Sequence, residues 1–512
     1  MADSETIISL LNRGRDGDPA IGAPGRQPLD FAGLRRHVRD TIARLNALGI
    51  GRNDKVAIVL ANGPEMATAF LAIGAGATTA PLNPAYREDE FDFYLSDLNA
   101  RALVIEKGTE SPARAVAAKR NIPVIELVPL ADQGAGLFRL EGPAKGAPAV
   151  ERQGRSTGPA QADDIALVLH TSGTTSRPKI VPLSQRNVCA SARHIRATLA
   201  LTPADRCLNI MPLFHIHGLI AAVLSSLEAG ASVHCTPGFN ALHIFRWLDE
   251  VKPSWYTAVP TMHQAILARA GRNKESIGRL KLRFIRSSSS SLPPPVMREL
   301  EETFGCPVLE AYGMTEASHQ MASNPLPPRP RKPGSVGVAA GPDVAIMDET
   351  GKLLTPGDVG EIVIRGPNVT NGYENNPQAN AGAFTNGWFR TGDQGVMDKE
   401  GYVTLTGRLK EIINRGGEKI SPREVDDVLM EHPAIAQAVT FAMPHEMLGE
   451  EVAAAVVLRE NMTADEKEIR AFVAKHVADF KVPRKVLILD EIPKGATGKL
   501  QRIGLAQKLG LG

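Results

Sequence analysis

A short apolar run that ends in a loop of small hydroxyl residues constrains the fold of this chain most. Residues 164–169 read Asp-Ile-Ala-Leu-Val-Leu, which is typical of a buried strand. Residues 170–182 then read His-Thr-Ser-Gly-Thr-Thr-Ser-Arg-Pro-Lys-Ile-Val-Pro, and Gly173 supplies the turn because glycine adopts backbone angles that other residues avoid. Backbone N–H groups, hydroxyls and cations on one loop suit a polyphosphate, although a solvated Ser/Thr-rich hairpin would also explain the polarity.

Helix and strand patterns alternate on the N-terminal side of this loop. Residues 31–48 carry apolar side chains at helical spacing, and glycine at positions 49 and 51 ends the helix. Residues 55–60 and 103–105 are strand-like, with a buried helix expected at 65–77, whereas the Gly-, Ala-, Pro- and Gln-rich residues 130–162 suggest an exposed connection. The alternation predicts an α/β fold with a substantially parallel sheet, and 512 residues favour two or more domains.

Composition excludes several classes of function. A net charge of +2 gives no basic field for nucleic acid, and no stretch of about 18 apolar residues is present to span a bilayer. The four cysteines form no Cys-x-x-Cys pair, and the acidic N-terminus has no apolar signal core. We therefore expect a cytoplasmic protein with neither a membrane nor a nucleic acid as partner, and the sequence does not indicate its oligomeric state.

A second motif, at residues 310–316, reads Glu-Ala-Tyr-Gly-Met-Thr-Glu. Tyr312 offers a flat face for adenine, and Thr315 can bond a phosphate oxygen. Glu316 supplies the hard oxygen ligands that Mg²⁺ prefers. The motif therefore fits the same polyphosphate ligand as the loop at 171–179.

Together the two motifs resemble those of the acyl-adenylate-forming enzymes, the family that includes the acyl-CoA synthetases. That family's loop usually reads Thr-Ser-Gly-Thr-Thr-Gly-x-Pro-Lys-Gly-Val; here Ser176 and Ile180 replace two glycines, and we expect phosphate binding to survive. Asp393 matches the family's aspartate that accepts from the ribose hydroxyls, and Arg408 matches its arginine near ribose and phosphate. The resemblance implies an ATP site formed by Thr171, Ser172, Gly173, Thr174, Thr175, Lys179, Glu310, Ala311, Tyr312, Gly313, Thr315, Asp393, Arg408 and Lys499.

The same resemblance implies a division of the chain and a set of reactive residues. It implies a large AMP-binding domain of layered sheets and helices at 1–408 and a small mobile α/β domain at 409–512, with the hinge at Lys410. The catalytic residues would be Lys499, His215, Glu316 and Thr175, with Mg²⁺ held by Thr175 and Glu316 and coenzyme A met by Gly416, Gly417 and Glu418. The expected reaction joins a carboxylic acid to coenzyme A through an acyl-adenylate, with release of pyrophosphate and AMP.

The acid is suggested by a closer resemblance. Residues 310–325, 212–218, 255–260 and 283–288 are similar to those of the oxalate–CoA ligases within this family, so oxalate is the expected acid. The polar candidates to bind it are His215, Ser288, Ser289 and His319, and a helix would place His319 on the face of Glu316. His217 is more simply a structural histidine. Malonate, a medium-chain acid, a carrier-protein adenylation enzyme and a non-enzymatic nucleotide-binding protein are the alternatives.

Overall fold

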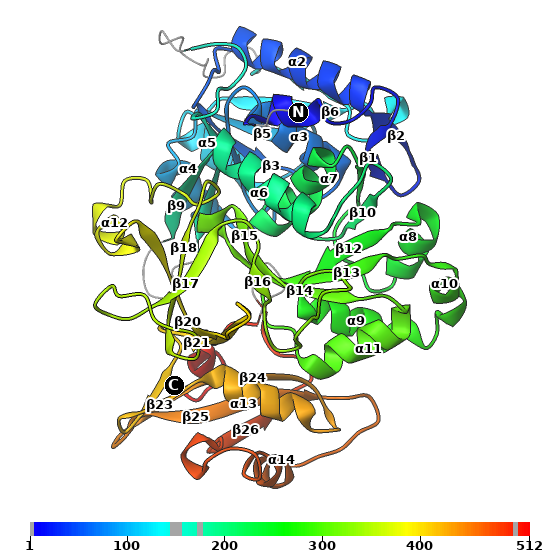
Figure 1. The fold of residues 1–512 in the computed structure, drawn as a ribbon. Coiled ribbons are helices and arrows are strands. Elements are labelled where there is room, and N and C mark those ends of the chain that lie inside the picture. The colour runs from blue at the N-terminus through cyan, green and yellow to red at the C-terminus, as the bar shows by residue number, and fades with distance from the viewer. Residues whose placement is uncertain (1–4, 144–155, 172–177, 495–499) are drawn as a thin grey trace.

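Two large sheets with a helical layer between them form the N-terminal part of the chain (Figure 1). The computed structural model describes residues 5–143, 156–171, 178–494 and 500–512. Helices α3 and α6 contact strands of both sheets, and the helix η2 contacts strands of the first sheet together with α3 and α6, so the three form the layer between the sheets. They span Pro64–Gly74 (α3), Gln185–Thr198 (α6) and His217–Leu224 (η2).

The first sheet carries the motif at 310–316. Its order is β16 (Val338–Ala339), β15 (His319–Ser323), β14 (Val308–Met314), β13 (Phe284–Ser288), β12 (Trp255–Ala258), β10 (Arg206–Asn209), β11 (Ser232–Cys235), β1 (Pro19–Ala23), β2 (Arg26–Asp30). The strands from β14 to β1 are mutually parallel, and the strands at the two edges are antiparallel.

The second sheet carries the hydroxyl-rich loop. Its order is β7 (Phe138–Glu141), β6 (Val124–Pro129), β5 (Ala102–Glu106), β3 (Lys55–Val59), β4 (Thr78–Pro81), β8 (Ile165–Thr171), β9 (Lys179–Ser184). Strands β6 to β8 are parallel, and β9 returns antiparallel to β8 after the loop. Both sheets confirm the α/β fold with parallel strands that the alternation predicts.

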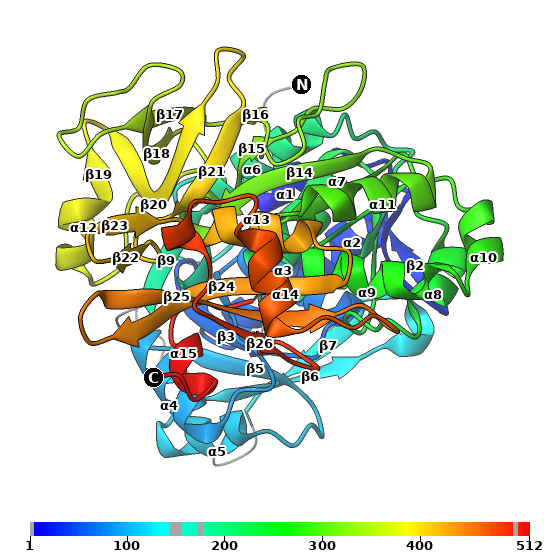
Figure 2. The ribbon, with the colours of Figure 1, turned by 90° about the horizontal axis from the view of Figure 1, so that it is seen from below.

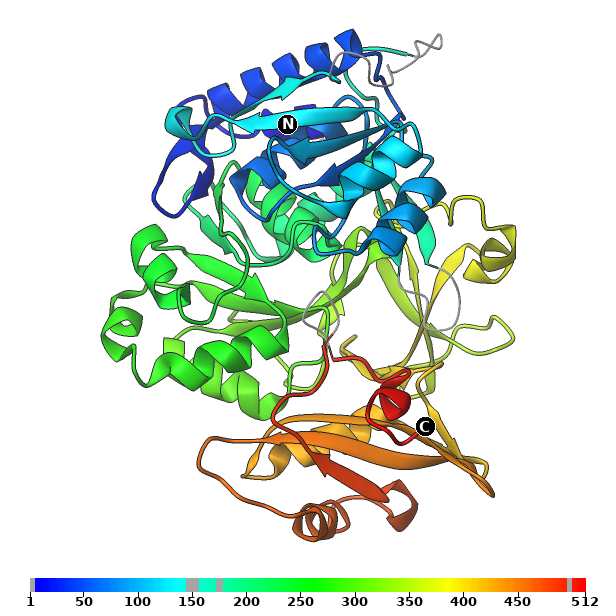
Figure 3. The same ribbon diagram turned by 180° about the vertical axis from the view of Figure 1, so that it is seen from behind.

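Two smaller sheets follow. An antiparallel sheet contains β17 (Asp343–Met347), β18 (Val359–Arg365), β19 (Phe384–Thr385), β20 (Trp388–Met397) and β21 (Val403–Arg408). The C-terminal sheet contains β22 (Ile413–Arg415), β23 (Glu418–Ile420), β24 (Ile435–His445), β25 (Gly449–Leu458) and β26 (Lys485–Ile488). Figure 2 views the molecule from the C-terminal end, and in Figure 3 this unit again lies below the larger sheets.

The remaining helices cover the sheets. They are α1 (Ile7–Leu11), α2 (Phe31–Ala47), α4 (Glu88–Asp97), α5 (Pro112–Lys119), η1 (Ala131–Gln133), α7 (Ser225–Glu228), α8 (Ile244–Val251), α9 (Pro260–Ala270), α10 (Lys274–Arg279), α11 (Pro294–Phe304), η3 (Thr315–Ala317), α12 (Pro377–Ala383), α13 (Pro422–Glu431), α14 (Glu466–Val473), η4 (Asp479–Lys481) and α15 (Leu505–Lys508). Within the described ranges, none of them is long and apolar enough to cross a membrane.

One expected element differs from the structure. The connection expected at 130–162 contains β7, an edge strand in which Phe138 and Leu140 are buried. The apolar and polar residues alternate over only four positions there, which is too short a pattern to distinguish from a loop.

Candidate active site

Three predicted nucleotide-binding residues meet where the first sheet approaches the antiparallel sheet. Tyr312 lies on β14, and its hydroxyl donates to a carboxylate oxygen of Asp393 on β20. Arg408 ends β21 directly opposite Asp393, and its Nε donates to Asp393 Oδ1 over 2.9 Å. The charge of Asp393 raises the pKa of Arg408, while the side chain of Arg408 stays 54% exposed. Buried Asp393 therefore links an aromatic face to an accessible cation, an arrangement suited to a nucleoside phosphate.

A second group forms around Glu316. The hydroxyl of Tyr373 donates to Glu316 Oε1 over 2.8 Å, and Lys179 Nζ lies 3.8 Å from the centroid of the Tyr373 ring. Burial raises the pKa of Glu316 and lowers that of Lys179, and each opposes the shift of the other. Tyr373 was not among the predicted site residues, because a lone tyrosine after a glycine carries no motif of its own.

The phosphate loop is described only at its two ends. Thr171 ends β8 and pairs with Lys179, the first residue of β9. Inside the described ranges the buried hydroxyl of Thr171 has no hydrogen-bond partner. The predicted loop residues Ser172, Gly173, Thr174 and Thr175 lie outside the described residues, as does the predicted catalytic residue Lys499.

Strand β14 places the rest of the motif at 310–316. Glu310 is buried and accepts from the backbone N–H of Leu292 over 3.0 Å. Ala311 contributes its carbonyl, which accepts from Ser288 Oγ over 2.8 Å. Gly313 has to lack a side chain, because a Cβ there would lie 2.1 Å from the carbonyl oxygen of His319. Thr315 begins the short helix η3, at the end of β14.

The predicted acid-binding residues gather around His217. Ser289 Oγ lies 3.0 Å from His217 Nδ1, and the rings of His217 and His319 are 4.9 Å apart. The backbone N–H of His217 donates to His215 Nδ1 over 3.3 Å. We call His215, His217, Ser289 and His319 the histidine cluster. Ser288 was predicted with them, but its hydroxyl is used within the sheet, on the carbonyl of Ala311.

One expectation about this cluster is wrong, and one residue at its centre was not predicted. A helix from Glu316 to His319 is wrong, because η3 ends at Ala317 and His319 begins β15 with a left-handed backbone, φ 98°. Arg286 was not among the predicted residues, although it is buried and in contact with His217 at the centre of this region. The sequence feature that could have indicated Arg286 is that it is a second arginine within the strand-like run at 282–288.

The predicted coenzyme A loop lies on the C-terminal unit. Gly416 and Gly417 form the turn between β22 and β23 with φ of 57° and 98°, values that favour glycine. Glu418 begins β23 and is exposed. Arg415, just before the turn, donates to Glu451 over 2.6 Å and fixes the hairpin to β25. Lys410, the predicted hinge, is exposed in the turn that follows β21.

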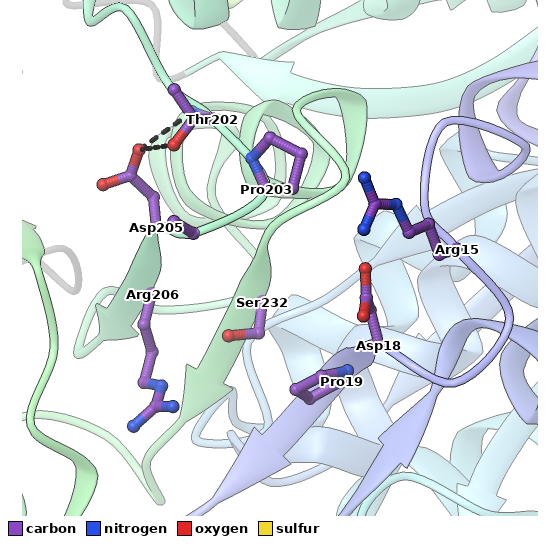
Figure 4. Close-up of a pocket in the computed structure, with 9 residues that line it drawn as sticks. Arg15, Asp18, Pro19, Thr202, Pro203, Asp205, Arg206 and Ser232 are labelled. Atoms are coloured by element: carbon purple, nitrogen blue, oxygen red, sulfur yellow. Dashed lines mark hydrogen bonds between the residues drawn. The ribbon is translucent and has the colours of Figure 1, made fainter.

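A polar recess of about 460 Å³ lies elsewhere on the first sheet (Figure 4). It is lined by residues at the amino ends of β1, β10 and β11, namely Pro19, Arg206 and Ser232, together with their neighbours. Ser289 and Met314 lie at or just past the carboxyl ends of β13 and β14, where ligands bind in open α/β sheets. The recess is therefore not the candidate active site.

Comparison with known proteins gives two family matches and several similar proteins. Residues 12–374 match the AMP-binding enzyme family, and residues 424–499 match the AMP-binding enzyme C-terminal domain. An oxalate–CoA ligase of Arabidopsis thaliana is 47% identical over 99% of this chain and 99% of its own. An oxalate–CoA ligase of Saccharomyces cerevisiae is 44% identical over 89% of this chain and 87% of its own. The crystal structure of ATP-bound MatB from Rhodopseudomonas palustris superposes with a TM-score of 0.86, at 30% identity, over 99% of this chain and 98% of that one.

Proposed function

The chain belongs to the AMP-binding enzyme family, and from that premise we propose that it joins oxalate to coenzyme A at the expense of ATP. The observation that carries the choice of acid is the histidine cluster, in which buried and half-buried hydrogen-bonding side chains gather beside the predicted nucleotide-binding motif of β14. Oxalate is a small dianion, and each of its carboxylates needs hydrogen-bond partners when it leaves water. A fatty acid would instead need an apolar channel. The identity to oxalate–CoA ligases of a plant and a yeast supports the same acid.

The reaction has two steps. A carboxylate oxygen of oxalate attacks the α-phosphorus of ATP, and pyrophosphate leaves to give an acyl-adenylate. The thiol of coenzyme A then attacks the adenylate carbonyl, and AMP leaves as the thioester forms. In this proposal Tyr312, Asp393 and Arg408 hold the nucleoside, while Lys179 and the loop at 171–179 hold the phosphates. Such residues catalyse by positioning the reactants and by neutralising charge.

The surroundings of Glu316 are suited to a magnesium ion. Mg²⁺ in nucleotide sites is usually held by one or two carboxylates together with substrate phosphates. Among the described residues no cluster of three His, Cys, Asp or Glu side chains is placed to hold a metal, but Glu316 offers one buried carboxylate beside Lys179. Burial raises the pKa of Glu316, and a bound cation would favour its charged form. We propose that Glu316, with Thr175, holds Mg²⁺, which would neutralise phosphate charge.

We further propose that two domains, 1–408 and 409–512, change their relative orientation about Lys410 between the two steps. Lys499 would serve the first step, as a point charge on the carboxylate and α-phosphate. The exposed turn of Gly416, Gly417 and Glu418 would face coenzyme A in the second step. A cytoplasmic location is also proposed, supported by four cysteines that are all free and buried.

The proposal is tested by competitive turnover of oxalate, malonate, acetate and octanoate by the purified protein. Oxalate should have the highest kcat/KM. His319→Ala should raise the KM for oxalate or lower kcat/KM by roughly two to four powers of ten, because a buried charge loses a partner. The KM for ATP should change little, and His243→Ala, which removes an exposed histidine at the start of α8, is the matched control. Acetate or octanoate exceeding oxalate would overturn the assignment of the acid.

A further inference from the structure

Arg286 is a buried cation that has no acidic partner in the part of the chain that the structure describes. It lies on β13, in the middle of the first sheet, and its relative exposure is 0%. Among the described residues, no Asp or Glu oxygen forms an ion pair with it, and its Nε has no hydrogen-bond partner. Burial lowers the pKa of Arg286 to about 9, so the guanidinium still carries its charge at neutral pH.

The described hydrogen-bond partners of Arg286 are a histidine, a threonine and a glutamine, none of which carries a negative charge. Its Nη2 donates to Gln320 Oε1 over 3.3 Å, and Nη1 lies 3.5 Å from Thr257 Oγ1 and 3.4 Å from His217 Nε2. The amide nitrogen of Gln320 is committed to Thr198 and to the carbonyl of Ala340. A buried charge is costly unless it is paired, so this cation favours an anion close to the histidine cluster.

The direction of the hydrogen bonds follows from the chemistry of arginine. A guanidinium only donates, so the nitrogen of His217 that faces Arg286, Nε2, has to accept. Thr257 Oγ1, which is 2.6 Å from the same nitrogen, then donates to it as well. His217 is consequently neutral and carries its proton on Nδ1.

The other ring nitrogen of His217, Nδ1, contacts Ser289 and so determines the orientation of its hydroxyl. Nδ1–H donates to Ser289 Oγ over 3.0 Å, so the hydroxyl proton of Ser289 remains available for a further acceptor. Ser289 lies just past the carboxyl end of β13 and holds a left-handed backbone, φ 73°. Non-glycine residues adopt that conformation at a cost, and such residues concentrate at ligand sites.

We propose that Arg286 is a positioning residue for acid specificity: through His217 it orients the Ser289 hydroxyl as a donor, and its charge favours the second carboxylate of a dicarboxylate substrate. This inference rests on the proposed function, because it assigns the second carboxylate of the acid to that same site. Arg286 is not itself placed in contact with the acid.

The kinetic test compares Arg286→Met with Arg286→Lys and with Arg283→Met. We expect Arg286→Met to raise the KM for oxalate by at least about 100-fold, as expected when a buried charge loses its counterpart, and to leave the KM for ATP within about twofold. Arg286→Lys keeps the charge and a donor, so it should restore most of the loss. Arg283 lies just before the same strand and pairs with Asp205 over 2.6 Å, so its loss should leave the KM for oxalate unchanged.

The spectroscopic test reads the tautomer directly and does not depend on the substrate. In protein labelled with ¹⁵N-histidine, two-bond ¹H–¹⁵N spectra should show His217 protonated on Nδ1, with His217→Gln used to assign its signals. Arg286→Met should shift that proton toward Nε2, whereas Arg283→Met should not. These spectra remain informative if Arg286→Met folds poorly, because the wild-type tautomer is itself a prediction.

The outcomes separate the two proposals. A wild-type protein that prefers acetate or octanoate overturns the proposed function. A wild-type protein that prefers oxalate, while Arg286→Met retains the KM for oxalate, overturns the role of Arg286 and leaves the function intact. Protonation of wild-type His217 on Nε2 overturns the role of Arg286 in either case.

Discussion

Glu310 is a buried carboxyl group whose ionisation is disfavoured by its surroundings. Its side chain is 1% exposed, one carboxylate oxygen accepts from the N–H of Leu292, and the other has no partner among the described residues. Burial raises the pKa of Glu310 to about 7, and the charge of Arg423 opposes the shift. Its predicted part in nucleotide binding stays a prediction.

This shift predicts a pH-dependent contribution to stability. The folded-state pKa lies above the unfolded value, so the contribution is complete below about pH 4.3 and is lost as the pH rises through about 7. Glu310→Gln cannot ionise, so its unfolding free energy relative to wild type should increase by on the order of 2–4 kcal/mol between pH 4.5 and pH 8. Thermal unfolding of both proteins at several pH values measures the trend.

The matched control for this experiment is Glu302→Gln, on the exposed face of the neighbouring helix α11. Its melting temperature should differ from wild type by a constant amount at every pH. If the melting temperature of Glu310→Gln also differed from wild type by the same amount at every pH, the raised pKa of Glu310 would be contradicted.

At the scale of elements, the connection from β21 to β22 joins the nucleotide site to the C-terminal unit. Arg408 ends β21 and contacts Asp393, and its carbonyl accepts from the N–H groups of Glu411 and Ile412. The carboxylate of Glu411 accepts from Arg502, which also binds Asp426 of α13. The turn containing Lys410 therefore lies between two anchored groups and is itself exposed.

Lys410→Pro is predicted to separate the two half-reactions. Proline fixes φ near about −65° and restricts the preceding residue, so it obstructs rotation of the backbone at this turn. Pyrophosphate exchange should stay near the wild-type rate, whereas thioester formation should fall at least about tenfold, because only the second step needs the rearrangement.

Lys410→Ala is the control, since it removes the charge but leaves the backbone free to rotate. It should keep both half-reactions near normal. Unchanged thioester formation in Lys410→Pro would contradict the hinge, and an equal loss of both half-reactions would indicate a folding defect.

At the scale of the whole molecule, the C-terminal unit meets the larger sheets through individual polar contacts and through a buried apolar cluster that includes residues of both, such as Ile285 and Val425. The side chain of Gln264 on α9 donates to the carbonyl of Ala436 on β24 over 2.7 Å. Arg423 on α13 donates to the carbonyl of Gly334 over 3.3 Å. Such polar contacts can be exchanged for others at modest cost, which is compatible with the proposed change of orientation between the two steps.

A cross-link is predicted to trap one of those orientations. Gln264→Cys combined with Ala436→Cys places two reactive thiols in the half-buried interface, while the four native cysteines are buried. After treatment with a short bismaleimide, overall thioester synthesis should fall at least about tenfold, and one half-reaction should remain within about threefold.

The single-cysteine proteins, treated in the same way, are the controls for this experiment. They should keep both half-reactions and the overall rate. Full turnover by the cross-linked double variant would show that no reorientation is needed.

The sequence by itself determined the main helices and strands and brought together the groups predicted to bind the nucleotide. Helix α2 is readable because its apolar residues keep helical spacing and Gly49 follows it with φ 86°. Tyr312, Thr315 and Glu316 are readable because they lie within a few residues of one another in one motif. Periodicity and short motifs are local properties, so they are present in the chain before it folds.

Only the tertiary structure decided how the side chains proposed to bind the acid meet. Ser289 and His217 are separated by 72 residues, and His217 and Arg286 by 69, so no local pattern relates them. Their contact depends on the order of strands in the first sheet and on the place of η2 against it. The conformation at His319 was likewise not predictable from local sequence, because the irregular pairing of β14 with β15 places it in a strand and not in the expected helix. Polar groups that are distant along the chain become neighbours only when the sheet buries them, since burial then requires each of them to find a partner.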